Sequence, residues 1–242
     1  MTKTIAIFGA GPGLGTSVAR RFGREGYRVA LVGRRPEPLE ALVVTLAAEG
    51  VEAAAFPADL RDLGSIPALV AAITDRFGSI DVVEYAPVAE GGFVPAAELT
   101  AEALRPLLDI YLLAPVEVVR AVLPQMLERG DGAILLGHGA SAVLPPPGMS
   151  GPGQAMGAAR NWIHGLHAEL APRGVYAGTI AIAAMIERSA AHDALRSGAI
   201  TIDLPDGVEL PTVDPDGLAD TLWAMAATRD RVETVLPEGA GF

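Results

Sequence analysis

Short apolar runs alternate with longer amphipathic stretches along the chain. Seven runs have the composition of buried strands, and they cover residues 3–8, 28–33, 51–56, 80–85, 132–137, 175–181 and 232–236. Six stretches between them predict helices, at residues 14–25, 37–49, 62–77, 99–129, 153–171 and 215–228. Strands that alternate with helices predict a parallel sheet covered on both faces, and nearly continuous apolar strands fit that burial. The pattern therefore predicts a three-layer α/β architecture.

Two segments interrupt this alternation. Residues 138–152 are rich in Gly and Pro and predict a loop, whereas residues 185–213 have mixed polarity and no clear period. Both follow predicted strands, so we expect them at the carboxyl edge of the sheet, where open parallel sheets bind ligands. We expect the second segment to form a substrate loop or lid. One α/β domain can run to roughly 250 residues, so residues 1–242 predict a single domain.

Composition narrows the function classes. The chain contains no cysteine, which excludes disulfides, thiolate metal sites and cysteine nucleophiles. Its histidines are not paired with carboxylates at metal-ligand spacing, so we expect no metal site. A net charge of −11 argues against nucleic-acid binding. No apolar run reaches the roughly 20 residues of a membrane helix, and no signal peptide is visible. We expect a cytoplasmic protein that acts on a small molecule.

A glycine-rich turn follows the first predicted strand. Residues 9–15 read GAGPGLG. The spacing GxGxxG fails because Leu14 stands where a glycine is required, but Gly9, Gly13 and Gly15 match GxxxGxG. Such glycines let backbone amides approach a pyrophosphate at the positive end of the next helix. Glycine turns also serve packing, yet the strand–turn–helix context favours a dinucleotide. The expected contacts are Gly9, Gly11, Pro12, Gly13, Leu14 and Gly15.

The residues after the second strand indicate which dinucleotide binds. An acid there holds the ribose 2′-hydroxyl of NAD, whereas an arginine suits the 2′-phosphate of NADP. Gly33 is followed by Arg34 and Arg35, with no acid before Glu37. The planar guanidinium matches phosphate; the alternative is a pair of solvated surface arginines. This position favours NADP(H) over NAD(H).

Asp59 and Leu60 follow the third strand. The Asp59 carboxylate can accept a hydrogen bond from an adenine amino group. It can equally serve as the N-cap of the next helix, and the two roles are compatible.

Several motifs together carry a family resemblance. They are GxxxGxG at residues 9–15, the arginine after the second strand, Asp59-Leu60, and residues 80–82, 123–126 and 157–170. On these motifs the chain resembles classical short-chain dehydrogenases/reductases over nearly its whole length. The resemblance implies a Rossmann-type, doubly wound, seven-stranded parallel sheet with helices on both faces. It also implies a homodimer or homotetramer formed through helices 99–129 and 153–171, and cofactor contacts from Ala86 and Pro87.

The resemblance fails at the active site. The family uses an Asn, a Ser, a Tyr that acts as general acid/base, and a Lys that lowers the Tyr pKa. Aligned on the helix at 153–171, these four positions hold Tyr111, Gly139, Pro152 and Met156. The only lysine, Lys3, lies at the start of the first strand, so the chain has no YxxxK pair. We expect the usual proton-transfer route to be absent.

Tyr111 and His138 are the candidate catalytic residues. A phenol pKa of about 10 would have to be lowered, whereas histidine can serve as acid or base near neutral pH. The alternatives are a Tyr111 that packs in its helix with a bonded hydroxyl and a His138 that lies in a solvated loop. The expected substrate contacts are Val88, Ser141, Val143, Met156, Met185 and His192.

Three functions remain open. The first is an atypical NADP(H)-dependent oxidoreductase acting on a small, apolar substrate, since hydride transfer is the chemistry of the cofactor. The second is a non-redox isomerase, cyclase or dehydratase, because fold does not fix function. The third is an inactive nucleotide-binding partner subunit. The family resemblance favours the first.

Overall fold

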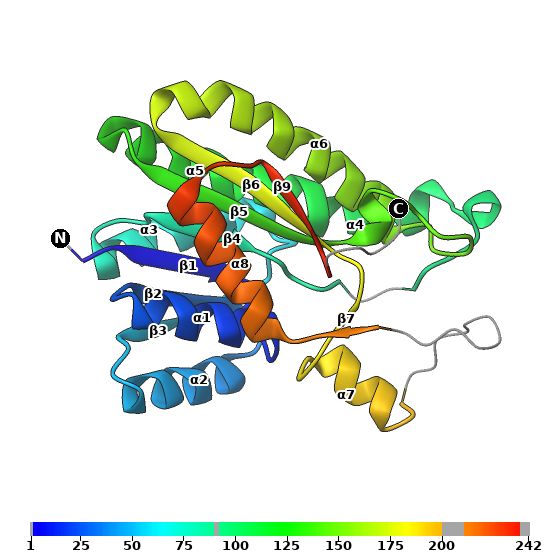
Figure 1. Cartoon of the computed structure of the whole chain (residues 1–242), viewed down its shortest axis with the longest axis horizontal. Coiled ribbons are helices and arrows are strands. Elements are labelled where there is room, and N and C mark those ends of the chain that lie inside the picture. The colour runs from blue at the N-terminus through cyan, green and yellow to red at the C-terminus, as the bar shows by residue number, and fades with distance from the viewer. Residues whose placement is uncertain (1, 90–91, 200–210, 238–242) are drawn as a thin grey trace.

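The computed structural model describes residues 2–89, 92–199 and 211–237. Seven parallel strands form one sheet in the order β3-β2-β1-β4-β5-β6-β9 (Figure 1). Their bounds are β1 (Thr4–Phe8), β2 (Arg28–Gly33), β3 (Ala53–Pro57), β4 (Val82–Tyr85), β5 (Gly132–Gly139), β6 (Val175–Ile182) and β9 (Glu233–Leu236). The predicted seven-stranded parallel sheet is confirmed.

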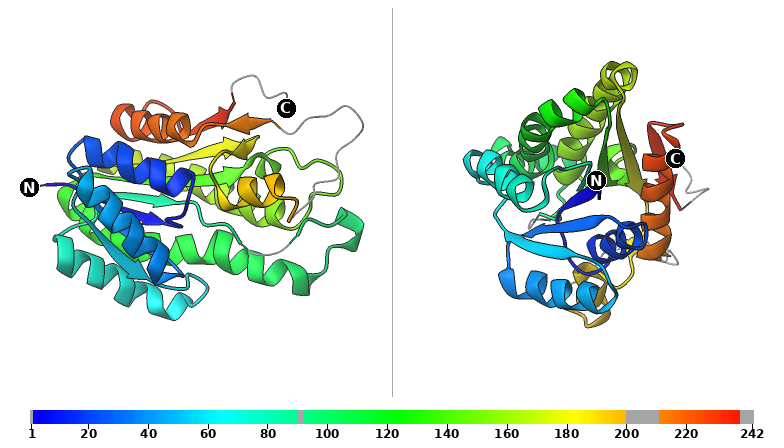
Figure 2. Two further views of the ribbon diagram at one scale, coloured as in Figure 1. Left: turned by 90° about the horizontal axis from the view of Figure 1, so that it is seen from below. Right: turned by 90° about the vertical axis from the view of Figure 1, so that its left-hand side faces the viewer.

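Helices cover both faces of the sheet (Figure 2). One face packs against α1 (Leu14–Arg24), α2 (Pro36–Ala48) and α8 (Pro215–Thr228), and the other against α3 (Ile66–Phe77), α5 (Ala114–Arg129) and α6 (Pro152–Leu170). Alternate strand residues serve the two cores: Ile5 and Ile7 of β1 pack on the first face, and Ala6 and Phe8 on the second. This alternation is the period-two geometry of a strand buried on both sides.

Several predicted element boundaries differ from the structure, two of them near the predicted site. The helix expected at 99–129 is divided into α4 (Ala101–Leu108), a π-helical turn (Asp109–Leu113) and α5. The loop expected at 138–152 is shorter, because β5 continues through His138 to Gly139 and α6 begins at Pro152. Apolar periodicity does not register a single extra residue within a helical turn, so sequence reasoning missed the π turn.

The predicted lid at 185–213 lies partly outside the described residues, which omit 200–210. Its described parts are β7 (Met185–Ile186), α7 (Ala190–Arg196) and β8 (Thr212–Val213). β7 and β8 pair in parallel as a separate two-stranded sheet. The segment therefore has secondary structure that its mixed polarity did not predict.

One carboxyl group is buried inside the sheet. Glu84 of β4 is 1% exposed and lies beside Ile7 of β1 and Leu135 of β5. Burial raises its pKa to about 8, because a carboxylate is poorly solvated in an apolar interior. Its Oε1 atom has no hydrogen-bond partner among the described residues. Glu84 is therefore largely protonated at neutral pH.

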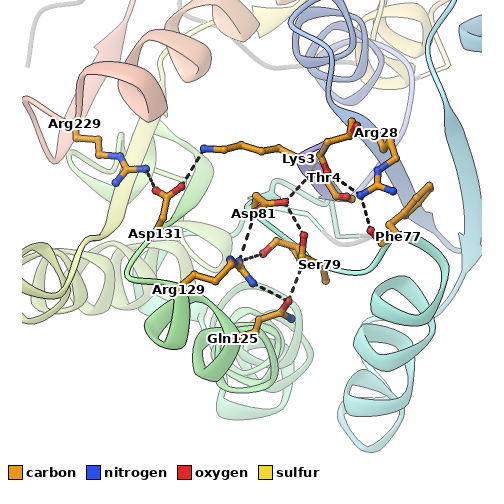
Figure 3. A network of polar contacts seen from close by, with 12 residues as sticks. Lys3, Thr4, Arg28, Phe77, Ser79, Asp81, Gln125, Arg129, Asp131 and Arg229 are labelled. Carbon is orange, nitrogen blue, oxygen red and sulfur yellow. Dashed lines mark hydrogen bonds and ion pairs between the residues drawn. The ribbon is translucent and has the colours of Figure 1, made fainter.

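A polar network ties the amino-terminal edge of the sheet together (Figure 3). Asp131, which precedes β5, pairs with Lys3 Nζ at 3.0 Å and with Arg229 Nη2 at 2.6 Å. Asp81 accepts hydrogen bonds from the Thr4 amide and from the Ser79 hydroxyl. The network holds the sole lysine at the edge opposite the glycine turn, so Lys3 cannot serve a site there.

No helix among the described residues is both long enough and apolar enough to cross a membrane.

Candidate functional site

The glycine turn lies at the carboxyl edge of the sheet, where β1 separates β2 from β4. A β-carbon on Gly9 would lie 2.7 Å from the Pro87 backbone, and one on Gly15 would lie 2.9 Å from the Ala10 Cα. Gly9 also has a φ of 108°, a backbone conformation that residues other than glycine rarely adopt. Both glycines are thus required by close backbone approach, as the motif predicts.

The first turn of α1 fits a pyrophosphate. No side chain caps its N-terminus, and its first turn contains no acidic residue. A β-carbon on Gly11 would meet only the Gly9 carbonyl oxygen, at 3.8 Å, so this side of the turn is open. Amides at a helix N-terminus and the helix dipole both favour an anion there. Leu14 buries its side chain in the core, so only its backbone can contribute.

The groups expected to read the adenosine end lie close together. Arg61 hydrogen-bonds the Asp59 carboxylate and holds its pKa below the usual range, and the charge of Arg34 lowers that pKa further. Arg35 is exposed and precedes α2. Asp59 caps no helix, because α3 begins at Ile66 after Ser65. The N-cap alternative for Asp59 is therefore wrong.

A small cavity brings both candidate catalytic residues together. It is lined by Tyr85, Pro87, Tyr111, Leu136, Gly137, His138, Met156 and Ala159. Its volume of about 10 Å³ admits about one water molecule. The elements that build it are the ends of β4 and β5, the π turn and the start of α6.

The π turn places Tyr85. The Ala114 amide donates to the Asp109 carbonyl, as a π-helix requires. The same pattern would pair the Ile110 carbonyl with the amide of residue 115, but Pro115 has no N–H. The Tyr85 hydroxyl donates to this Ile110 carbonyl instead. Tyr85 thereby satisfies a buried acceptor that the proline leaves without a partner.

Tyr111 projects from the same π turn. Its hydroxyl oxygen accepts a hydrogen bond from the Ala89 amide at 3.0 Å. Burial raises its pKa, and the bond from Ala89 offsets only part of that rise. Tyr111 therefore stays protonated at neutral pH. It fits the packed, hydrogen-bonded role, and its hydroxyl proton remains able to donate to a ligand in the cavity.

His138 is buried in β5, so the expectation of a solvated loop residue is wrong. Its side chain is 5% exposed, and burial lowers its pKa. Nδ1 lies 3.1 Å from the Gly139 carbonyl oxygen, a contact that places the ring proton on Nδ1. Nε2 has no hydrogen-bond partner among the described residues. His138 thus presents a neutral ring with an unused acceptor.

The remaining family positions carry no ionisable group. The Gly139 amide donates to the Met156 sulfur at 3.4 Å, and Pro152 is buried at the first position of α6. Arg160, one turn beyond Met156, turns away to Glu233 of β9, with Nη2 to Oε1 at 2.8 Å. Among the described residues that line this cavity, none is a lysine or an arginine.

Most of the expected substrate contacts lie outside the small cavity. Met156 is among its lining residues, but the other five are not. Val88 is 79% exposed, and Ser141 is buried beneath the start of α6, against Gly153. Met185 and His192 belong to β7 and α7. Any substrate larger than a water molecule must therefore bind mainly outside this cavity or displace Met156.

Sequence reasoning missed the contact between the glycine turn and the segment after β7. A β-carbon on Gly13 would lie 3.1 Å from the Ser189 β-carbon. The two residues are far apart in the chain, and neither carries a motif that pairs them. Among the described residues, no three His, Asp or Glu side chains are grouped to hold a metal ion.

The solved structures that resemble this chain share its fold. An actinorhodin polyketide ketoreductase solved with NADPH has a TM-score of 0.85 and 24% identity, covering 97% of this chain and 95% of that one. An L-sorbose reductase from Gluconobacter frateurii, complexed with NADPH and L-sorbose, has a TM-score of 0.84 and 19% identity with the same coverage.

Curated relatives match in sequence over part of their length. A 2,3-dihydro-2,3-dihydroxybenzoate dehydrogenase of Bacillus subtilis is 33% identical over 170 residues, which are 70% of this chain and 64% of the relative. The ketoacyl reductase HetN of a Nostoc strain is 34% identical over 134 residues, 55% of this chain and 46% of the relative. The chain thus spans about half to two thirds of these relatives. The family model of short chain dehydrogenases matches residues 3–195. That match covers the parallel sheet whose first strand ends at the glycine turn, and it shows that the chain belongs to the short chain dehydrogenase family.

Proposed function

We propose that this chain binds NADP(H) and transfers hydride to or from a small, apolar substrate without the Tyr/Lys pair of its family. The observation that carries the proposal is the first turn of α1, which no side chain caps. It follows Gly9 and Gly13 and contains Gly15, and neither Gly9 nor Gly15 has room for a β-carbon. The relatives named as dehydrogenases and reductases support it, as do the neighbours solved with NADPH.

The cofactor would lie along the carboxyl edge of the sheet. The backbone of Gly9, Gly13 and Leu14 would hold the pyrophosphate, and Arg34 would meet the 2′-phosphate. Asp59 and Arg61 would border the adenine. The bound cofactor supplies the hydride, and the protein binds and orients it.

Tyr111 and His138 would polarise the substrate rather than exchange a proton with it. Burial raises the Tyr111 pKa and lowers the His138 pKa, so both groups are neutral near pH 7. The site then offers one hydroxyl donor and one ring-nitrogen acceptor but no stabilised ion. Hydride addition to an iminium ion needs no proton, and the enolate left by hydride addition to an enone can take its proton from water. Such a site therefore suits these substrates more than simple ketones, whose more basic alkoxide needs an acid in the site.

The test is NADPH consumption with matched panels of ketones, enones and cyclic imines. We expect turnover with enones or imines. Tyr111→Phe removes the donor and His138→Ala removes the ring acceptor, and each should slow turnover by up to about a hundredfold, the lower end of the range for one positioned hydrogen bond. Absence of NADPH consumption with every panel would contradict the proposal.

The small cavity favours a second candidate, a nucleotide-binding subunit without turnover. Met156 lines this cavity and its sulfur accepts a hydrogen bond from the Gly139 amide, so neither residue offers the lysine or the hydroxyl that the family resemblance leads one to expect at these positions. Tight NADPH binding combined with complete inactivity on all panels, and a specific complex with another protein, would favour this candidate over the first.

A further inference from the structure

The segment that follows β6 packs directly on the glycine turn. We define residues 185–199 as the cover segment. Ser189 caps α7, because its hydroxyl oxygen accepts a hydrogen bond from the His192 amide at 3.1 Å. Its Cβ and Cα would lie 3.1 and 3.2 Å from a β-carbon on Gly13. Figure 1 shows α7 beyond the end of α1 that begins at this turn. The cover segment therefore borders the position where a pyrophosphate would bind.

Polar links hold the cover segment in place. Arg188 Nη2 lies 2.5 Å from Asp214 Oδ1 and 2.9 Å from Asp216 Oδ2. The Asp216 carboxylate also accepts a hydrogen bond from the Ser17 hydroxyl at 2.6 Å, and Ser17 is buried in α1. The chain of contacts thus runs from the cover segment through the start of α8 to the helix that begins at the glycine turn.

Arg188 has an uncommon backbone conformation. Its φ is 59°, in the left-handed region that non-glycine residues rarely adopt. Such conformations persist where surrounding contacts fix them. The double ion pair with Asp214 and Asp216 is a contact of this kind, and it acts on the residue directly before Ser189.

Apolar packing does not bury any residue of α7 fully, although four of its residues are half-buried. The helix has seven residues and none is buried. A helix this short is marginal by itself, and segments with few buried contacts open most readily. At the base of the segment, the Met185 amide donates to the Pro211 carbonyl at 2.8 Å and the Glu187 amide to the Val213 carbonyl at 3.0 Å. Beyond this base, Arg188 provides the main polar anchor.

We propose that Arg188 fastens the cover segment onto the glycine turn, through Asp214 and Asp216, and so sets the rate at which the dinucleotide enters and leaves. The second half of this inference rests on the proposed function, because it requires NADP(H) at the turn. Arg188 acts as a positioning residue: it holds Ser189 against Gly13. A cover segment that packs on the turn must move before a bound dinucleotide can exchange.

The first experiment needs no nucleotide. Hydrogen exchange of the free protein is compared for wild type, Arg188→Lys, Arg188→Ala and Asp214→Asn; asparagine still caps a helix. Arg120→Ala is the control, because Arg120 pairs with Glu117 on the surface of α5. We expect peptides from 187–199 to exchange about three- to tenfold faster in Arg188→Ala, the range for two exposed ion pairs. Arg188→Lys should have a smaller effect and Arg120→Ala none.

Unchanged exchange at 187–199 in both Arg188→Ala and Asp214→Asn would overturn the fastening role. Faster exchange that extends equally to β5 peptides would also overturn it, since it would mean general destabilisation.

The second experiment measures NADPH association and dissociation by stopped-flow fluorescence. Both rates should rise about three- to tenfold in Arg188→Ala, and added salt should bring the wild-type rates toward those of the variant because exposed ion pairs are screened. Unchanged rates with faster exchange at 187–199 would overturn the coupling to the dinucleotide. A wild type that binds no NADPH would refute the proposed function and the coupling, while the exchange result would still decide the fastening role.

Discussion

The backbone amide of Gly139 donates a hydrogen bond to the sulfur of Met156 across 3.4 Å. The sequence alignment on α6 predicts that these positions correspond to the serine and lysine of the family. Here a weak acceptor and a backbone donor satisfy each other, and Met156 is 7% exposed. At these two positions the structure thus has a packed contact, and Met156 also lines the adjacent small cavity.

We expect Met156→Lys to destabilise the protein without creating a ketone reductase. The ammonium would be buried without a carboxylate partner, so its pKa should fall and the free energy of unfolding should drop by about 3 kcal/mol. Pro152 still supplies no phenol for proton transfer. Urea unfolding and NADPH consumption with ketones measure the two effects.

The matched control for that variant is Met156→Leu, which keeps the volume and should cost less than about 1.5 kcal/mol. A Met156→Lys protein as stable as Met156→Leu, or one that gains ketone reduction, would show that the site tolerates the family chemistry after all.

The hydrophobic pattern of the sequence was sufficient to predict the fold. Strands buried on both faces are almost uniformly apolar, and the intervening helices are amphipathic. The exceptions have local causes. Glu84 stands in an apolar strand, and no pattern reveals whether its charge is solvated or neutralised. The π turn depends on which carbonyl lacks a donor, and that follows from Pro115 only once the helix register is known.

The candidate site was predictable in part. The glycine turn is a local motif, so its residues could be named from the sequence. The pairing of Arg188 with Asp214 and Asp216 joins residues 26 and 28 positions apart, and no motif in the sequence links the two segments. The burial of His138 was missed because the Gly and Pro after it indicated a loop, whereas β5 extends through it to Gly139.

Stability should fall as the pH rises from about 5 to 8 because of Glu84. Its pKa is raised to about 8 in the folded protein from 4.5. Between these values the folded state retains a proton that the unfolded state has lost. The free energy of unfolding should therefore decrease by up to about 1.4 kcal/mol per pH unit. Glu84→Gln, which is neutral at every pH, should remove this slope.

Urea unfolding at several pH values measures the slope as the difference between wild type and Glu84→Gln. Glu102→Gln, on the exposed side of α4, is the control and should parallel wild type. Parallel profiles for wild type and Glu84→Gln would show that the buried carboxyl does not hold its proton.

Removing the Tyr85 hydroxyl should destabilise the π turn. In Tyr85→Phe the buried Ile110 carbonyl would lose its donor, and Pro115 cannot replace it. The expected loss is about 1–3 kcal/mol, the cost of an unsatisfied buried group. Tyr27→Phe is the control, since no hydrogen bond of its hydroxyl is found among the described residues and it should cost little. Equal unfolding free energies for the two variants would refute the role given to Tyr85.

The central claim is that the glycine turn and Arg34 form an NADP(H) site on a scaffold without the family's catalytic pair. Its most direct test is fluorescence titration of wild type and Arg34→Ala with NADPH and NADH. We predict that wild type binds NADPH more tightly than NADH. Arg34→Ala should weaken the binding of NADPH by about tenfold or more, since a charged hydrogen bond contributes about 1.5–3 kcal/mol. The affinity for NADH should stay nearly unchanged. No binding of either nucleotide would contradict the account.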